Sequence, residues 1–107
     1  MRDERHGQIV VIFQSERTPE GDAGYGAAAE AMEKLAATQP GYRGFESVRG
    51  AAGVGITLSY WADDASALAW KNHPEHKAIR DAGRDRWYTR YEVVVAAVQR
   101  DYRWDKG

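Results

Sequence analysis

The side chains best suited to chemistry lie between residues 61 and 98, which hold two of the three histidines and three of the four tryptophans. His73 and His76 are three residues apart, so their rings would share one face of a helix. Two imidazoles could begin a zinc or iron site, but such a site needs a third protein ligand, and Glu75 would point elsewhere. We therefore expect no metal. The favoured interpretation is that His73 caps a helix and His76 packs over a sheet.

Aromatic residues in the same stretch suggest a pocket. Trp70, Trp87, Tyr88 and Tyr91 could form its walls between a helix and a sheet, although aromatic residues at these spacings also pack ordinary cores. A few polar groups in an apolar setting favour a pocket. We predict that the substrate-binding residues are Asn72, His73, Trp87, Tyr88, Arg90 and Tyr91.

A pocket of this kind would suit a flat phenol or quinone and a reaction without a cofactor. A deprotonated phenol can itself give an electron to dioxygen, so the protein need only take the proton, stabilise the anion and exclude water. His76 is the candidate base, because imidazole titrates near neutral pH. Arg84 or Arg90 would hold the anion, and Trp70 would shape and dry the cavity. The predicted catalytic residues are thus Trp70, His76 and Arg84.

The composition argues against several other classes of protein. The chain has 107 residues, a formal net charge of −1 and no cysteine, which excludes disulfides and thiolate chemistry. Residues 84–91 mix arginines with aromatics, as binders of single-stranded nucleic acid do, but nearby acidic residues and the overall charge oppose that reading. Residues 50–55 are glycine-rich and lead into a strand, so they predict a hairpin turn and no phosphate loop.

No membrane association is expected either. The first seven residues are charged and lack the apolar core of a signal peptide, and no apolar run is long enough to span a bilayer. We expect a cytoplasmic protein of one domain over residues 1–107, with residues 1–7 flexible.

The order of the predicted elements defines a fold class. Strands are expected at 8–17, 43–49, 54–61 and 87–100, and helices at 22–39, 63–72 and 74–83. Asp22 and Asp63 would cap two helices, Leu68 would point inward, and Gly83 would end the last helix. This β-α-β-β-α-β order predicts an α+β protein with the ferredoxin-like plait, in which helices cover one face of an antiparallel sheet.

The apolar pattern of the first and last strands predicts a partner. Val10, Ile12, Val94, Ala96 and Val98 alternate with a second apolar set, so both faces of these strands are apolar. Helices on one face alone would leave the other in water, at a cost of roughly 1.5–3 kcal/mol for each large side chain. We therefore expect a homodimer through the sheet faces. The aromatic residues in the tail, residues 101–107, indicate that it docks on the partner chain.

Several segments together resemble the antibiotic biosynthesis monooxygenase (ABM) family of the dimeric α+β barrel superfamily. They cover most of the chain: residues 40–46, Tyr60-Trp61, the run W-K-N-H-P-E-H-K at 70–77, Gly83-Arg84, Trp87-Tyr88 and residues 91–95. The resemblance implies the same fold and dimer. Characterised members include cofactor-independent quinone-forming monooxygenases and haem-degrading enzymes. A non-catalytic dimer that binds small aromatic ligands is a further alternative.

The resemblance carries over only some functional residues. Trp70 matches the tryptophan that lines the pocket of both enzyme types. One helical turn earlier the quinone-forming members have asparagine, where this chain has Ser66, and a tyrosine that they use falls near His76. The axial histidine of the haem-degrading members aligns with Arg80, and their first-strand asparagine with Gln14. Both patterns are incomplete here.

Overall fold

One antiparallel sheet of four strands organises the chain. The computed structural model describes residues 4–18, 24–50 and 52–107. The sheet has the order β2-β3-β1-β4, and neighbouring strands are antiparallel throughout. The strands are β1 (Ile9–Arg17), β2 (Tyr42–Arg49), β3 (Val54–Trp61) and β4 (Tyr88–Ala97). Together with the helices this is the predicted ferredoxin-like plait, and the last strand ends three residues earlier than predicted.

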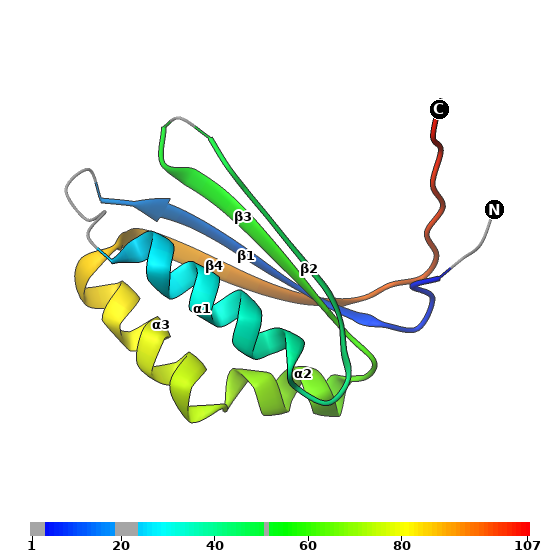
Figure 1. Cartoon of the computed structure of the whole chain (residues 1–107), viewed down its shortest axis with the longest axis horizontal. Coiled ribbons are helices and arrows are strands. Elements are labelled where there is room, and N and C mark those ends of the chain that lie inside the picture. Colours follow the sequence, from blue (N-terminus) through cyan, green and yellow to red (C-terminus); the bar gives the residue numbers. More distant parts are fainter. Residues whose placement is uncertain (1–3, 19–23, 51) are drawn as a thin grey trace.

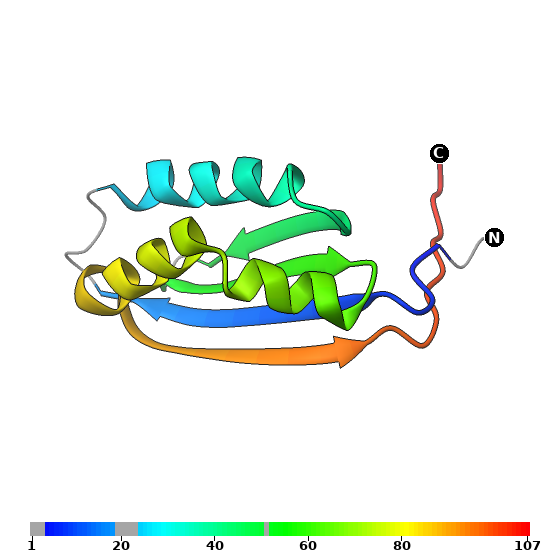
Figure 2. The same ribbon diagram turned by 90° about the horizontal axis from the view of Figure 1, so that it is seen from below.

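The described residues form three helices, α1 (Tyr25–Ala37), α2 (Asp64–Lys71) and α3 (Pro74–Arg86). All lie on one side of the sheet (Figures 1 and 2). The carboxylate of Asp63 accepts a hydrogen bond from the Ser66 N–H at 2.8 Å and caps α2 as predicted. The predicted start of the first helix, at Asp22, lies outside the described residues.

The end of α3 corrects a prediction. Gly83 does not stop this helix, which continues to Arg86. Gly83 is buried, and a Cβ atom at this position would lie 2.6 Å from the Tyr88 ring. The glycine therefore allows α3 to pack closely on the start of β4, and the residues predicted to cross to the last strand form the final helical turn.

The core lies between the helices and the centre of the sheet. Its buried members are Ala36, Trp61, Ala67 and Trp70, and partly buried side chains from β1, α1 and β2 surround them. The prediction that Leu68 points inward is wrong, because this side chain is 52% exposed. Ala67 and Trp70 are three residues apart and take the buried face of the short helix, which turns the intervening residues outward.

On the opposite side of the sheet, none of the described residues forms a covering helix (Figure 2). Strand register places a continuous set of apolar side chains there, which we call the open face: Val10, Ile12, Val48, Ile56, Leu58, Tyr60, Val94 and Ala96. Val48 is 70% exposed and Val94 is 42% exposed. The prediction that β1 and β4 are apolar on both faces is therefore confirmed. Within the described residues, no helix is both long and apolar enough to cross a bilayer.

Candidate functional site

Trp70 and His76 form a face-to-face stack at the junction of α2 and α3. Their ring centroids are 4.3 Å apart with an interplanar angle of 11°. On its other side Trp70 lies near Trp61 of β3, at 5.8 Å and 26°. His76 lies in the first turn of α3, directly after the break in the helix at His73-Pro74. We call Trp61, Trp70 and His76 the indole–imidazole stack.

A hydrogen bond determines which ring nitrogen of His76 carries the proton. Nδ1 of His76 lies 3.0 Å from the carbonyl oxygen of Trp70. Because that oxygen can only accept, Nδ1 carries the proton and donates, which leaves Nε2 as a free base. Burial lowers the pKa of His76 below its ordinary 6.5; the Trp70 carbonyl opposes this shift, and the charges of Arg80 and His73 add to it. His76 is thus neutral at neutral pH.

His73 has a structural role, as the favoured interpretation expected. Its Nδ1 accepts a hydrogen bond from the backbone N–H of Glu75 at 3.2 Å and caps α3, with Pro74 as the first helical residue. Its ring centroid is 5.9 Å from that of Trp70, at an angle of 50°. His73 therefore sits beside the stack, with one ring nitrogen already occupied.

The other predicted aromatic residues form a second group, at the far end of α3. Tyr88 and Tyr91 both contact Phe13, with centroids at 5.5 and 5.2 Å, and Tyr25 of α1 contacts Tyr88 at 6.0 Å. Tyr25 also lies edge-on to the buried Trp87. We call Phe13, Tyr25, Trp87, Tyr88 and Tyr91 the tyrosine cluster. The predicted single aromatic wall is therefore two groups, with Trp70 in one and the remaining three residues in the other.

Arginines surround the tyrosine cluster. Nε of the exposed Arg84 donates to the Tyr91 hydroxyl at 2.6 Å, and the Arg84 guanidinium lies 4.0 Å from Asp81. Arg49 donates to the Tyr25 hydroxyl and, at 3.4 Å, to the hydroxyl of the fully buried Ser15. Burial raises the pKa of Tyr88, so this phenol stays protonated.

Sequence reasoning missed Tyr25, Arg49 and Ser15. One signal was present for Ser15, because a serine interrupts the inward-facing set of an otherwise apolar strand. The contact between Arg49 and Tyr25 joins residues 24 positions apart. No local pattern encodes that contact.

The predicted base and the predicted anion holders lie far apart. His76 and Arg84 are eight residues apart on α3, which corresponds to about 12 Å along the axis. Arg90 points to the same side of the sheet as the open face, where its guanidinium lies 3.9 Å from Glu16. Asn72 is exposed at the C-terminal end of α2. Only Trp70, His73 and His76 of the predicted residues meet at the stack.

The residues aligned with family positions have other partners here. The Ser66 side chain belongs to the cap of α2, where its Oγ donates to Asp63. Arg80 donates to the Lys71 carbonyl oxygen at 3.3 Å. Gln14 is exposed and lies on the side of the sheet away from α3. A guanidinium has no lone pair for iron, so these residues do not fit haem in the manner of the haem-degrading members.

Two hollows of the described surface lie away from the stack. One, of about 560 Å³, is lined by residues of the two terminal segments, β2 and β3; another, of about 440 Å³, lies over the hairpin of β2 and β3. Neither has Trp70 or His76 in its walls. The described residues also contain no group of three His, Cys, Asp or Glu side chains placed to hold a metal ion.

Comparisons with known proteins agree with this architecture. The sequence pattern of the family described as "Antibiotic biosynthesis monooxygenase" matches residues 8–82. An uncharacterised Bacillus subtilis protein, YqjZ, is 51% identical over 91 residues, which cover 85% of this chain and 79% of that protein.

Solved structures with low sequence identity share the fold. Rv0793 of Mycobacterium tuberculosis superposes with a TM-score of 0.76 at 18% identity, over 85% of this chain and 94% of that chain. SnoaB of Streptomyces nogalater, described as a cofactor-independent oxygenase, has a TM-score of 0.73 at 13% identity, over 86% of this chain and 93% of its own.

Proposed function

Because this chain belongs to the antibiotic biosynthesis monooxygenase family, we propose that it is a cofactor-independent monooxygenase acting on a small aromatic compound of the phenol or quinone type. The observation that carries the proposal is the state of His76. Partial burial of the ring lowers its pKa and keeps this imidazole neutral, and the bond from Nδ1 to the Trp70 carbonyl leaves Nε2 free to accept a proton. The description of SnoaB, which shares the fold, supports the reaction class.

The reaction can be written without a cofactor. His76 Nε2 takes a proton from an activated CH₂ group or a phenol of the substrate. The resulting anion gives one electron to dioxygen, and the radical pair joins to form a peroxide at the substrate carbon. The peroxide takes the proton back from His76 and loses water. For a CH₂ group the sum is R₂CH₂ + O₂ → R₂C=O + H₂O, in which oxygen is reduced and the carbon is oxidised.

The other residues of the site have supporting roles in this proposal. The Trp70 ring and carbonyl hold His76 in one orientation and one tautomer. Arg84, with Nε bonded to Tyr91, offers its remaining N–H groups to a substrate oxygen. Because Arg84 lies about two turns of α3 from His76, a substrate that contacts both must be long and flat.

The same proposal includes a homodimer through the open faces. The exposed valines at positions 48 and 94 support it, since a second copy would remove them and their neighbours from water. Sedimentation equilibrium tests this part by itself. A single particle of 12 kDa at micromolar concentration would contradict the dimer.

Oxygen uptake with anthrone or a dihydroxynaphthalene tests the reaction. We expect the wild type to consume oxygen and His76→Ala to be slower by about 10²- to 10⁴-fold. His73→Ala is the matched control, because it removes a neighbouring imidazole whose Nδ1 only caps the helix, and it should retain most of the turnover. Absence of turnover in the wild type, or equal turnover by His76→Ala, contradicts this mechanism.

A second function is favoured by the closed packing of the stack. Trp70 is only 5% exposed and neither hollow reaches it, so a dimer that binds small aromatic ligands without transforming them would hold them away from His76. Quenching of tryptophan fluorescence by dihydroxynaphthalene, with no oxygen uptake at any pH between 6 and 9, would favour this alternative.

A further inference from the structure

The indole–imidazole stack continues into one more aromatic ring, at the start of β2. Tyr42 and Trp61 are directly opposite each other across β2 and β3, with ring centroids 5.9 Å apart and an interplanar angle of 81°. Trp61 lies 5.8 Å from Trp70, and Trp70 lies 4.3 Å from His76. Each ring is therefore a direct neighbour of the next, from His76 to Tyr42.

This row of rings leads from the interior of the protein to its surface. Trp61 is fully buried and Trp70 is 5% exposed, so water does not reach the middle of the row. Tyr42 is only partly buried, and it borders the hollow of about 560 Å³. The row thus has one end at the proposed base and the other end at solvent.

Close backbone contacts hold the outer end of the row in place. Gly41, directly before Tyr42, has a φ of 84° and lies so near α2 that a Cβ atom at this position would overlap the Ser66 side chain. The Gly41 carbonyl oxygen also accepts a hydrogen bond from the Ala62 N–H at 2.7 Å. Fixed rings at short separation favour electron transfer, because its rate falls steeply with distance and with the rearrangement that it requires.

The fate of the proton gives the row a direction. Nε1 of Trp61 donates to Oγ of the buried Ser59 at 3.0 Å. A serine hydroxyl is too weak a base to keep the indole proton, so an oxidised Trp61 would remain a cation and a strong oxidant. Tyr42 borders a hollow and can release its phenolic proton to water when it loses an electron. An oxidising equivalent on Trp61 would therefore move to Tyr42.

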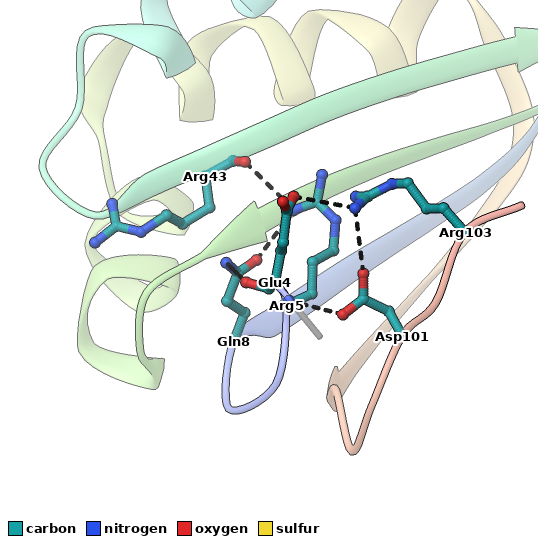
Figure 3. A network of polar contacts seen from close by, with 6 residues as sticks. All are labelled: Glu4, Arg5, Gln8, Arg43, Asp101 and Arg103. Carbon is teal, nitrogen blue, oxygen red and sulfur yellow. Dashed lines mark hydrogen bonds and ion pairs between the residues drawn. The ribbon is translucent and has the colours of Figure 1, made fainter. Parts of the chain in front are cut away.

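A second tyrosine at the same hollow is less suited to this role. Tyr60 also borders the hollow, but the Arg5 guanidinium lies 3.6 Å from the centre of its ring. Figure 3 shows how Arg5 is held there, through hydrogen bonds to Gln8 Oε1 at 3.0 Å and to the Arg43 carbonyl oxygen at 3.3 Å. A positive charge against a ring opposes the removal of an electron from that ring.

The tyrosine cluster contains another tryptophan–tyrosine contact, and cations cover it too. Trp87 and Tyr25 have ring centroids 5.7 Å apart. The guanidiniums of Arg17 and Arg49 lie 4.1 and 5.0 Å from the centre of the Tyr25 ring. Over the ring of Tyr42, by contrast, the described residues place no guanidinium. Oxidation is therefore easier at Tyr42 than at Tyr25.

We propose that Trp70, Trp61 and Tyr42 form an electron-transfer path that removes oxidising equivalents from the stack and releases them at the surface. Their source rests on the proposed function: a substrate radical that escapes the radical pair takes up dioxygen and becomes a peroxyl radical. Tyr42 supplies one electron to this radical through Trp61 and Trp70, and protonated His76 supplies the proton.

The step is balanced in atoms and electrons. Because Tyr42 gives its phenolic proton to water, the sum is ROO• + HisH⁺ + TyrOH → ROOH + His + TyrO• + H⁺. The peroxyl radical is reduced and the phenol is oxidised. A water-soluble reductant of the ascorbate type then returns one electron, and water one proton, to Tyr42. The path in this way protects Trp70 and His76 from oxidation.

A photochemical oxidant attached beside Trp70 tests the path without substrate. The chain has no cysteine, so Leu68→Cys on the exposed face of α2 takes up a single ruthenium photosensitiser. Flash excitation with an external quencher leaves a one-electron oxidant there, and electron paramagnetic resonance of rapidly frozen samples identifies the radical formed. We expect a tyrosyl radical, and in Tyr42→Phe its loss in favour of a tryptophan radical.

Matched variants in the same labelled chain assign the signal. Tyr25→Phe and Tyr60→Phe each remove a cation-covered phenol and should keep the tyrosyl signal of the parent. Trp61→Phe keeps a ring in the core but interrupts the path, so it should abolish the signal. The path is overturned if the parent forms no tyrosyl radical, if the radical persists in Tyr42→Phe, or if Tyr25→Phe or Tyr60→Phe removes it equally.

The protective role and the proposed reaction can be tested separately. Under repeated flashes with ascorbate, mass spectrometry should find more oxidised Trp70 and His76 in Tyr42→Phe than in the parent; equal amounts would refute protection. A radical at Tyr42 in a protein that takes up no oxygen with anthrone removes the proposed monooxygenase and leaves the path. Oxygen uptake without that radical overturns the path and leaves the monooxygenase.

Discussion

Two aromatic groups lie under the helices, and they differ in what their polar atoms can do at neutral pH. The indole–imidazole stack contains one titratable group, His76, whose Nδ1 donates to the Trp70 carbonyl and whose Nε2 is free. The tyrosine cluster contains phenols, and the guanidinium groups of Arg49 and Arg84 contact it. Burial raises the pKa of Tyr88 further from neutrality, and an arginine always keeps its charge.

The two ends of α3 can therefore have separate roles, proton transfer at the stack and anion binding at the tyrosine cluster. A proton can be taken only at the stack, where an imidazole is kept neutral by burial. The cluster can donate hydrogen bonds and hold an anion, through Arg84 and the hydroxyl of Tyr91. A long, flat substrate that reaches both ends would use both tasks, which is why the proposed substrate is an aromatic compound of more than one ring.

Of the changes considered, removal of the Trp70 indole should have the largest effect, because it alters both the stability of the protein and the pKa of His76. Trp70→Ala should lower the free energy of unfolding by about 3–5 kcal/mol, because it empties a buried site. It should also bring the pKa of His76 back toward 6.5. Urea denaturation measures the first effect and NMR titration the second.

Trp87→Ala is the matched control for that change. Trp87 is buried to the same extent but belongs to the tyrosine cluster, so the loss of stability should be similar while the His76 titration stays as in the wild type. A Trp70→Ala protein that loses less than about 1 kcal/mol, or an equal change of the His76 pKa in both variants, would show that the two groups are not distinct.

A smaller effect is expected in the pH dependence of the free energy of unfolding, and we expect His76 of the stack to cause it. The pKa of His76 is lowered by folding, so the unfolded chain binds this proton at a higher pH than the folded chain. The stabilising contribution is therefore complete above pH 6.5. It is lost as the pH falls from there toward the pKa of the folded state.

Urea denaturation at pH 7.5 and pH 5.5 tests this sign. The wild type should lose more stability between these two pH values than His76→Gln, which lacks the titrating group. Equal losses in the two proteins would mean that His76 is not held neutral by the fold.

The smallest effect is expected at the other end of α3. Tyr91→Phe removes one hydrogen bond, to Arg84, whose side chain is exposed to water. The free energy of unfolding should fall by no more than about 1 kcal/mol, and the His76 titration should not change. A loss above about 2 kcal/mol would indicate that this hydroxyl belongs to a buried network instead of a surface contact.

Local patterns were enough to predict most of the fold. Alternation of apolar residues fixed both faces of β1 and β4, and a capping residue before a short apolar run fixed the start of α2 at Asp63. The His73-Pro74 pair predicted the break between α2 and α3. Each of these features depends only on residues a few positions apart.

The features that were missed depend on contacts between distant segments. The rotation of α2, which exposes Leu68, follows from how closely Ala67 approaches the sheet. The role of Gly83 follows from the position of the Tyr88 ring. The position of Arg90 is different, because strand alternation already places it on the same face as Val94. The face of the sheet on which Arg90 lies could therefore have been predicted from the sequence.

The protonation state of the His76 ring tests the central claim most directly. In ¹⁵N-labelled protein at pH 7.5, long-range ¹H–¹⁵N correlations distinguish a protonated ring nitrogen from an unprotonated one. We expect a neutral ring with its proton on Nδ1, an unprotonated Nε2, and a titration midpoint below 6.5. A ring with its proton on Nε2, or one that titrates at or above pH 6.5, would contradict the assignment of His76 as the base.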